Sequence, residues 1–380
     1  MIPYGKQSVD QEDIKSVAKV LKSDFLTTGP KIQEFEKKFS KYVGSKYAVA
    51  VSSGTAALHL ACLASGLKEK DELITSPLTF AASANCALYC GAKPIFVDIN
   101  NQGVIDENKI EQKVTKKTKI IIPIHYSGLP CNLAYIKKIA QKDKLIIIED
   151  ASHALGARYK NSKIGDVQYS NMAVFSLHPI KHITTGEGGV ITTNTKKFYE
   201  KLIMLRNHGI TKDNSKFKLK SSKFAEPWYY EMQELGFNYR LTDLQCALGI
   251  SQLKKIGKFI KCRREIAKKY NQVFNNLKHI EIIKENKDQF NAYHLYPIRV
   301  ENEKIRLKLF KFLQKNGVLC QVHYIPVYWH PFYKKLGYQK GLCPIAENFY
   351  QREISLPIYP SLKIKSADYV IKKILKFFGK

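Results

Sequence analysis

The sequence predicts an α/β fold with a mostly parallel central sheet, followed by a smaller C-terminal α+β domain. In roughly the first 200 residues, short β-branched apolar runs alternate with longer helical patterns. These runs are apolar almost throughout, as expected for parallel strands that are covered on both faces. The length of 380 residues fits one large and one small domain.

Each expected strand of the sheet is a short apolar run bounded by turn residues. The runs cover residues 47–51, 72–75, 94–98, 119–124, 145–150, 172–175 and 189–193. Helical patterns fill three of the connections, at residues 55–63, 81–89 and 133–141. Because ligands of such sheets bind beyond the carboxyl ends of the strands, we expect the functional residues there.

The second half of the chain predicts a different organisation. Residues 212–222 are rich in Lys and Ser and are expected to form an exposed loop. A long helix is expected from Thr242 to Leu277, and Thr242 and Asp243 suit its N-cap. Short strands follow, with helices at residues 303–316 and 365–378. We therefore predict a large domain at residues 1–255 and a small one at residues 256–380.

The chain carries 62 Lys and Arg residues against 33 Asp and Glu, a formal net charge of +29. Only eight of the basic residues are arginines, although recognition of bases and phosphates favours arginine. The lysines are scattered along the sequence, often in pairs. This distribution favours drift of the amino-acid composition, as in an AT-rich genome, over a binding function. Attraction of an anionic small molecule is the second interpretation. We expect no nucleic-acid partner.

Other features narrow the class of protein further. No apolar run reaches 18 residues, so we expect no membrane span. The first residues show no basic segment followed by an apolar run, so a cytoplasmic location is expected. The eight cysteines form no CxxC pair and several lie in apolar runs. This pattern favours buried thiols in a reducing compartment over a metal site.

Three stretches carry candidate chemistry, and the first is residues 52–58. Gly54 permits a close approach of the backbone, and the first N–H groups of the following helix would face a bound anion. The hydroxyl of Thr55 adds a donor. This arrangement predicts a phosphate cup, although an ordinary N-capped helix has the same pattern.

The second stretch places Asp150 directly at the end of a buried strand. A carboxylate there is costly unless a cationic group pairs with it. The protonated ring nitrogen of pyridoxal phosphate is one such group, because it needs a carboxylate to keep its proton. An aspartate that caps a helix is the alternative.

The third stretch contains Lys181, in a loop between the strand at residues 172–175 and a Gly-rich turn. Ser176 precedes it and can reach a phosphate. Burial and nearby cations lower the pKa of a lysine, as Schiff-base chemistry requires. Together the three stretches predict a pyridoxal phosphate site at the carboxyl edge of the sheet.

The chain resembles the DegT family of sugar aminotransferases nearly end to end. Six motifs carry the resemblance, at residues 53–58, 149–154, 175–181, 186–189, 205–209 and 238–245. The resemblance implies fold type I, the fold of aspartate aminotransferase, with pyridoxal 5′-phosphate bound by the large domain. Relatives that deoxygenate sugars have histidine in place of Lys181, so the lysine implies transamination.

The resemblance also implies roles for individual residues. Lys181 would attach the cofactor and move protons, Asp150 would pair with the ring nitrogen, and His153 would lie near the phenolic oxygen of the ring. For His153, a structural histidine is the alternative. Phe80 matches an aromatic residue that stacks on the ring, with core packing as the alternative.

The remaining implied roles concern anions and a second subunit. Gly54, Thr55 and Ser176 would bind the cofactor phosphate. Asn238 matches an asparagine that reaches the phosphate of the neighbouring subunit, which implies a homodimer with a shared active site. Arg206 and Arg240 are candidates for the diphosphate of the substrate, or else structural ion pairs.

Within the family, residues 152–156, 175–181, 294–298 and 321–328 resemble the branch of pseudaminic acid biosynthesis. This implies L-glutamate as the donor and, as the acceptor, C4 of UDP-2-acetamido-2,6-dideoxy-β-L-arabino-hex-4-ulose, a UDP-linked 4-keto-6-deoxy-N-acetyl sugar. Pro179 departs from the pattern, where a small residue is expected. The alternatives are a 4-aminotransferase of the bacillosamine or dTDP-sugar type and a non-catalytic regulator on the same scaffold.

Overall fold

The computed structural model describes residues 1–219 and 226–379, and a seven-stranded sheet lies at its centre. The strand order is β1-β9-β8-β5-β4-β2-β3. The strands are β1 (Tyr47–Val51), β2 (Glu72–Thr75), β3 (Lys93–Phe96), β4 (Thr118–Ile122), β5 (Ile146–Asp150), β8 (Met172–Ser176) and β9 (Gly189–Thr193). Strand β9 is antiparallel to both β1 and β8, and the other pairs are parallel. The predicted, mostly parallel α/β sheet is confirmed.

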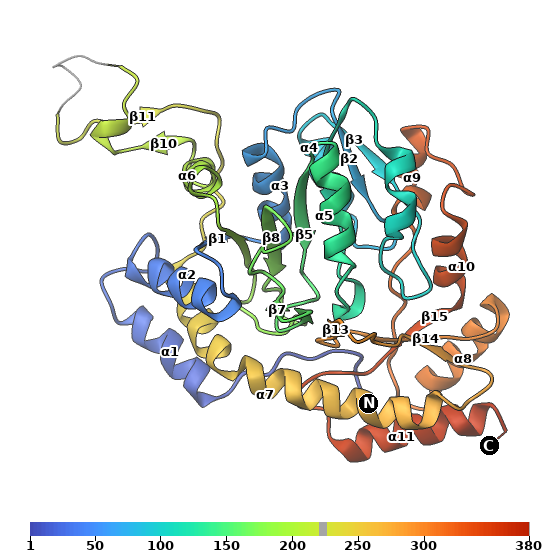
Figure 1. The fold of residues 1–380 in the computed structure, drawn as a ribbon. Coiled ribbons are helices and arrows are strands. Elements are labelled where there is room, and N and C mark those ends of the chain that lie inside the picture. The colour runs from blue at the N-terminus through green and yellow to red at the C-terminus, as the bar shows by residue number, and fades with distance from the viewer. Residues whose placement is uncertain (220–225, 380) are drawn as a thin grey trace.

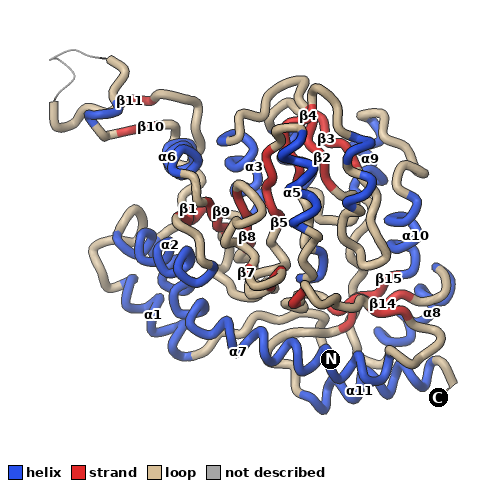
Figure 2. Tube along the Cα trace, viewed as in Figure 1, coloured by secondary structure: helices blue, strands red, loops and turns tan. Residues whose placement is uncertain are grey.

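Helices cover both faces of this sheet (Figures 1 and 2). On β1, Val49 and Val51 join the apolar cluster of one face, and Ala48 and Ala50 join that of the other, because side chains alternate along a strand. The first face packs against α3 (Gly54–Ala64), α4 (Ala82–Tyr89) and α6 (Lys196–Leu205). The second packs against α2 (Pro30–Val43), α5 (Leu133–Lys142) and α7 (Asp243–Phe274). Helix α1 (Gln11–Leu21) packs against α7.

Helix α7 is the longest element, with 32 residues. Thr242 caps it as predicted: its side chain accepts a hydrogen bond from the N–H of Gln245, and the Gln245 side chain bonds back. The helix ends at Phe274, three residues before the predicted Leu277, and the N–H of Leu277 bonds the carbonyl of Phe274 in a closing turn. Strand β4 also ends early, at Ile122, because Pro123 has no N–H to continue the ladder.

A third apolar cluster fills the C-terminal part of the chain. Here a small antiparallel sheet has the order β12-β14-β15, made of β12 (Glu281–Ile282), β14 (Tyr296–Arg299) and β15 (Glu353–Leu356). Helices α8 (Glu303–Lys315) and α11 (Ile364–Phe377) pack with it, close to their predicted ranges. Two further helices, α9 (Pro331–Lys335) and α10 (Pro344–Arg352), lie between α8 and β15.

The division into domains at residues 255 and 256 stays a prediction. Helix α7 passes this point without a break, and its residues change from the first to the third cluster between Ile260 and Ile266. The chain also crosses between the two parts: Ile2 pairs with Val318, and Phe349 belongs to the first cluster.

Two small sheets complete the fold. One has the order β13-β6-β7, from β6 (Arg158–Tyr159), β7 (Ser162–Lys163) and β13 (Gln289–Phe290). The other pairs β10 (Ile210–Thr211) with β11 (Glu231–Met232) in an arm that projects from the body (Figure 1). Of the predicted loop at residues 212–222, residues 214–216 form a short 3-10 turn, and residues 220–222 lie outside the described residues.

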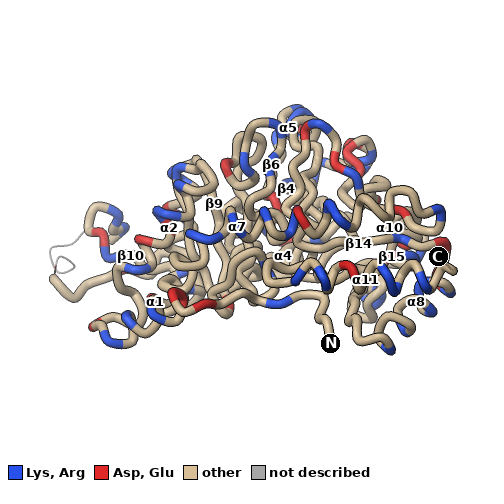
Figure 3. Tube along the Cα trace, turned by 90° about the horizontal axis from the view of Figure 1, so that it is seen from below, with Lys and Arg blue, Asp and Glu red and all other residues tan. Residues whose placement is uncertain are grey.

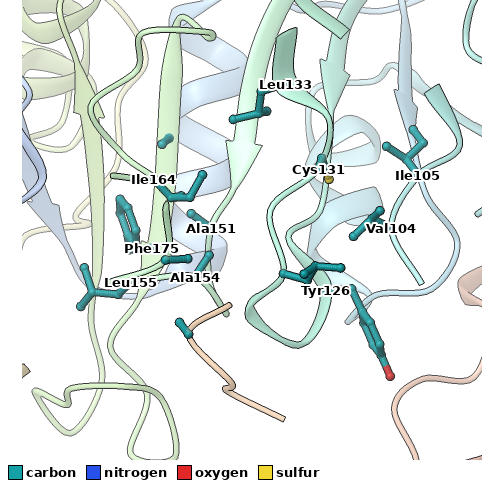
Figure 4. Close-up of a cluster of buried hydrophobic side chains, with 14 of the residues drawn as sticks. Val104, Ile105, Tyr126, Cys131, Leu133, Ala151, Ala154, Leu155, Ile164 and Phe175 are labelled. Atoms are coloured by element: carbon teal, nitrogen blue, oxygen red, sulfur yellow. The ribbon is translucent and has the colours of Figure 1, made fainter. Parts of the chain in front are cut away.

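The core reaches to the ends of the strands that carry the predicted site (Figure 4). Ala151 and Ala154, from the segment after β5, are buried close to Phe175 of β8 and Ile164. The loop that carries His153 is therefore anchored on apolar side chains on both sides of this histidine.

In Figure 3, Lys and Arg are spread over most elements and lie close together along α8 and α11. None of the described helices is long and apolar enough to cross a membrane.

Candidate active site

A cavity of about 410 Å³ opens at the carboxyl ends of β5 and β8. Seven of the predicted site residues line it: Gly54, Thr55, Phe80, Asp150, His153, Ser176 and Lys181. Phe80 is 63% exposed at this cavity, which rules out core packing as its role. The structure thus brings together side chains from four separate stretches of the sequence.

The N-terminus of α3 forms one wall of the cavity. Ser53 caps this helix by accepting a hydrogen bond from the N–H of Ala56. The N–H groups of Gly54 and Thr55 are at the first two helical positions, where an α-helix offers no partner of its own. A Cβ atom on Gly54 would lie 3.0 Å from Cβ of Ser176, which is why glycine suits this position. The free N–H groups and two hydroxyls suit a phosphate group.

Asp150 is 5% exposed at the end of β5. The hydroxyl of Ser83 donates to its Oδ2 over 2.6 Å, and the N–H of Ser152 donates to Oδ1 over 3.1 Å. No helix begins in the segment that directly follows Asp150, because its residues form turns that lead to β6. Asp150 therefore does not cap a helix, and its carboxylate is held in place beside the cavity.

Lys181 closes a turn in which its N–H bonds the carbonyl of His178 over 2.9 Å. Pro179 occupies the second position of this turn, where its fixed φ is favoured, so the proline fits the local backbone. Burial lowers the pKa of Lys181 to about 8, although the nearby carboxylate of Asp150 acts in the opposite direction. A lysine with a lowered pKa is available as a nucleophile near neutral pH.

His153 contacts two further rings at the cavity. Its Nε2 lies 3.2 Å from the hydroxyl of Tyr324, and its ring centroid lies 4.3 Å from that of His294. Burial, with a smaller contribution from the charge of Lys181, holds the pKa of His153 well below its usual range, so the ring is neutral. Its Nδ1 is buried without a hydrogen-bond partner in the described part of the chain. Nδ1 of the buried residues His182 and His294, which do not line the cavity, has no such partner either.

Several cavity residues were not among the predicted site residues. Ser83 and Tyr4 carry no local signal, since one lies in an apolar helix and the other near the start of the chain. His323 and Tyr324 belong to residues 321–328, one of the stretches that resemble the branch of pseudaminic acid biosynthesis, but their neighbours Val327 and Tyr328 are core residues. An aromatic stretch in the sequence alone does not show which of its residues line the cavity and which belong to the core.

Residues 7–375 match the DegT/DnrJ/EryC1/StrS aminotransferase family. The chain belongs to this family.

Curated relatives and a solved structure cover almost the whole chain. A UDP-4-amino-4,6-dideoxy-N-acetyl-beta-L-altrosamine transaminase of Campylobacter jejuni is 41% identical, over 97% of this chain and 96% of its own. A GDP-perosamine synthase of Escherichia coli O157:H7 is 35% identical, over 100% and 99%. The structure of Helicobacter pylori PseC, an aminotransferase of pseudoaminic acid biosynthesis, has a TM-score of 0.91 and 34% identity, covering 100% of this chain and 99% of that one.

As a DegT/DnrJ/EryC1/StrS aminotransferase, the chain is a pyridoxal phosphate-dependent nucleotide-sugar transaminase of fold type I. The cavity fits this cofactor: the glycine cradle beside Ser176 suits its phosphate, and the orphaned Nδ1 of His153 offers a partner for a polar group. When bound, pyridoxal phosphate supplies an electron sink for reactions at the substrate carbon that carries nitrogen.

The three remaining predicted residues of the family motifs lie away from the cavity. Arg206 pairs with the buried Glu36 and donates to the carbonyl of Ala50 over 2.7 Å, so it is a structural ion pair. Arg240 donates to the side chain of Asn207 over 2.6 Å. Asn238 is exposed and does not line the cavity of its own subunit.

Proposed function

We propose that this chain transfers an amino group from L-glutamate to C4 of UDP-2-acetamido-2,6-dideoxy-β-L-arabino-hex-4-ulose. The product would be UDP-4-amino-4,6-dideoxy-N-acetyl-β-L-altrosamine, a precursor of pseudaminic acid. The observation that carries the proposal is the lysine-centred cavity in a chain 41% identical to the Campylobacter jejuni transaminase over nearly its full length. The structural likeness to Helicobacter pylori PseC, with a TM-score of 0.91 over the whole chain, also supports it.

The cavity residues suggest how the chain would do this. Gly54, Thr55 and Ser176 would bind the cofactor phosphate, and Phe80 would stack on the ring. Asp150, oriented by the donors Ser83 and Ser152, would hold the proton on the ring nitrogen.

The proton transfers fall to Lys181 and His153 in this proposal. Nζ of Lys181 would attach the cofactor and then take and return the proton on the substrate carbon, for which a pKa of about 8 is suited. His153, neutral and next to Tyr324, would contact the phenolic oxygen of the ring.

We further propose a homodimer in which Asn238 binds the cofactor phosphate of the partner subunit. Asn238 follows the projecting β10–β11 arm, which exposes several large apolar side chains. These are Trp228 (76%), Met232 (60%) and Leu235 (76%). Exposed apolar side chains gathered on one arm favour contact with another protein surface. Asn238→Ala should lower cofactor affinity, and sedimentation should give twice the mass of one chain.

The substrate is tested by incubating the enzyme with L-glutamate and, separately, the β-L-arabino ketosugar, its α-D-xylo epimer and a GDP-linked 4-keto-6-deoxy sugar. We expect 2-oxoglutarate and an amino sugar only with the first. Turnover of only the D-xylo epimer would assign the chain to bacillosamine-type synthesis. Turnover of only the GDP-linked sugar would assign the chain the activity of a GDP-perosamine synthase.

A non-catalytic regulator on this scaffold is separated by labelling. Borohydride reduction of the enzyme, followed by digestion and mass spectrometry, should find a phosphopyridoxyl group on Lys181. A Lys181→Met variant is the matched control and should carry no such label. A protein without label and without turnover of any of the three sugars would favour the regulator.

A further inference from the structure

Glu353 and Ser355 of β15 form a buried hydrogen-bonded group with His323 at the wall of the cavity. Oε2 of Glu353 accepts a hydrogen bond from the backbone N–H of His323 over 2.8 Å, and Oε1 lies within hydrogen-bond distance of the Ser355 hydroxyl. The same hydroxyl lies 2.8 Å from Nδ1 of His323. Glu353 and Ser355 are fully buried, whereas His323 lines the cavity that contains Lys181.

Glu353 forms no ion pair with a basic side chain of the described residues. Arg299 faces it across the β14–β15 ladder but pairs with Glu281 over 2.9 Å. Burial raises the pKa of the Glu353 carboxyl to about 8, so it keeps its proton near neutral pH. The other ionisable groups that act on it or feel its charge are Arg306 of α8, Tyr126, Cys320, His323 and Tyr324.

His323 is neutral, because burial and the charge of Lys181 lower its pKa to about 3. A neutral imidazole has one N–H and one bare nitrogen. Since Nδ1 faces Ser355, the direction of the serine hydroxyl decides which nitrogen carries the proton. Nε2 is then the ring nitrogen left for a group in the cavity.

The single proton of the Ser355 hydroxyl links the two ends of this group. When the Glu353 carboxyl is protonated, it can donate to Ser355, whose hydroxyl then donates to Nδ1 of His323, and Nε2 carries the proton. When the carboxyl is ionised, the hydroxyl donates to it, Nδ1–H donates to the hydroxyl, and Nε2 is bare.

We propose that Glu353 is a positioning residue that acts through Ser355 to keep His323 in the tautomer with its proton on Nε2. His323 thereby presents a hydrogen-bond donor to an acceptor oxygen of the sugar, a carbonyl or hydroxyl oxygen. The inference rests on the proposed function only in taking the occupant of the cavity to be a sugar.

The tautomer is measured directly, without substrate, in the cofactor-loaded enzyme. Long-range ¹H–¹⁵N spectra of ¹⁵N-histidine-labelled protein distinguish the two tautomers, and His323→Gln assigns the signal by its loss. We expect the Nε2–H form at pH 6.5 and the Nδ1–H form at pH 9.5. Glu353→Gln, whose amide donates to Ser355 as the protonated acid does, should keep the Nε2–H form at both values.

Controls make the result decisive. Ser355→Ala should abolish the preference, and Ser251→Ala, a buried serine of α7 outside the cavity, should leave it unchanged. An Nδ1–H form in the wild type at pH 6.5, or the same pH response in Glu353→Gln, overturns the proposal.

The contact with the sugar is tested on the same variants. Ser355→Ala should raise KM for the ketosugar about tenfold, the effect of one lost hydrogen bond, and leave the half-reaction with glutamate unchanged. An unchanged KM would show that His323 does not donate to the sugar. If no ketosugar is turned over by the wild type, the proposed function fails while the tautomer result still decides the role of Glu353.

Discussion

The hydroxyl of Ser83 lies 2.6 Å from Oδ2 of Asp150 and 2.8 Å from the hydroxyl of Thr79. Ser83 comes from α4, and Asp150 ends β5, so a helix on one face of the sheet fixes a carboxylate at its carboxyl edge. Both side chains are almost fully buried, and a hydrogen bond to a buried charge is strong. The orientation of Asp150 therefore depends on a residue 67 positions earlier in the chain.

Ser83→Ala should weaken binding of pyridoxal phosphate about tenfold, because Asp150 loses a donor that is worth roughly 1.5 kcal/mol. Equilibrium dialysis of the cofactor measures this effect. Ser65→Ala is the control, since Ser65 donates to the carbonyl of Ala61 at the other end of α3. Equal affinities of the two variants would mean that Ser83 does not orient Asp150.

Lys181→Met should stabilise the cofactor-free protein at pH 7 by about 2 kcal/mol, because the native state disfavours a charged Lys181. The pKa of this lysine falls from its usual 10.5 to about 8 on folding, so the penalty is complete below pH 8. It disappears as the pH rises from 8 to 10.5. Urea unfolding at pH 7 and pH 10 should therefore show a difference between variant and wild type that shrinks at the higher pH. A constant difference would contradict the lowered pKa.

Gly54→Ala should raise the dissociation constant of pyridoxal phosphate about fivefold, because the new methyl group would crowd Ser176 at the phosphate cup. The matched control is Gly257→Ala, in the middle of α7, where a Cβ atom meets nothing within 4 Å. That substitution should stabilise the protein by about 0.5–1 kcal/mol through helix propensity alone. Fluorescence titration with the cofactor and thermal unfolding measure the two effects. Tighter cofactor binding by Gly54→Ala would rule out the cup.

Arg206→Met should destabilise the protein by about 3 kcal/mol, since it leaves the buried Glu36 without its cation. KM for the sugar should stay unchanged, because Arg206 lies outside the cavity. The exposed pair of Lys216 and Glu200 serves for comparison, and Lys216→Met should cost at most about 0.5 kcal/mol. Urea unfolding and steady-state kinetics test both points. A raised KM with unchanged stability would assign Arg206 to the substrate.

The sheet and the centre of the site could be predicted because their signals are local. Asp150 follows an apolar run directly, and Gly54 lies between a strand and a helix, so sequence order alone places both at one edge. Contacts between distant segments leave no such signal. The sequence makes Arg206 a candidate for binding a diphosphate, whereas in the structure it forms an ion pair with Glu36, 170 positions away. Tyr4 and His323 reach the cavity through the crossing of the chain between its two parts, which no periodicity records.

The unbroken course of α7 limits how this enzyme can open and close. At 1.5 Å per residue its 32 residues form a rod of about 48 Å that is embedded in two apolar clusters. A hinge needs backbone torsions that can change, and a rod held by hydrogen bonds along its length offers none at the point where the clusters meet. A swing of one half of the molecule against the other would therefore have to bend this rod or break its hydrogen bonds.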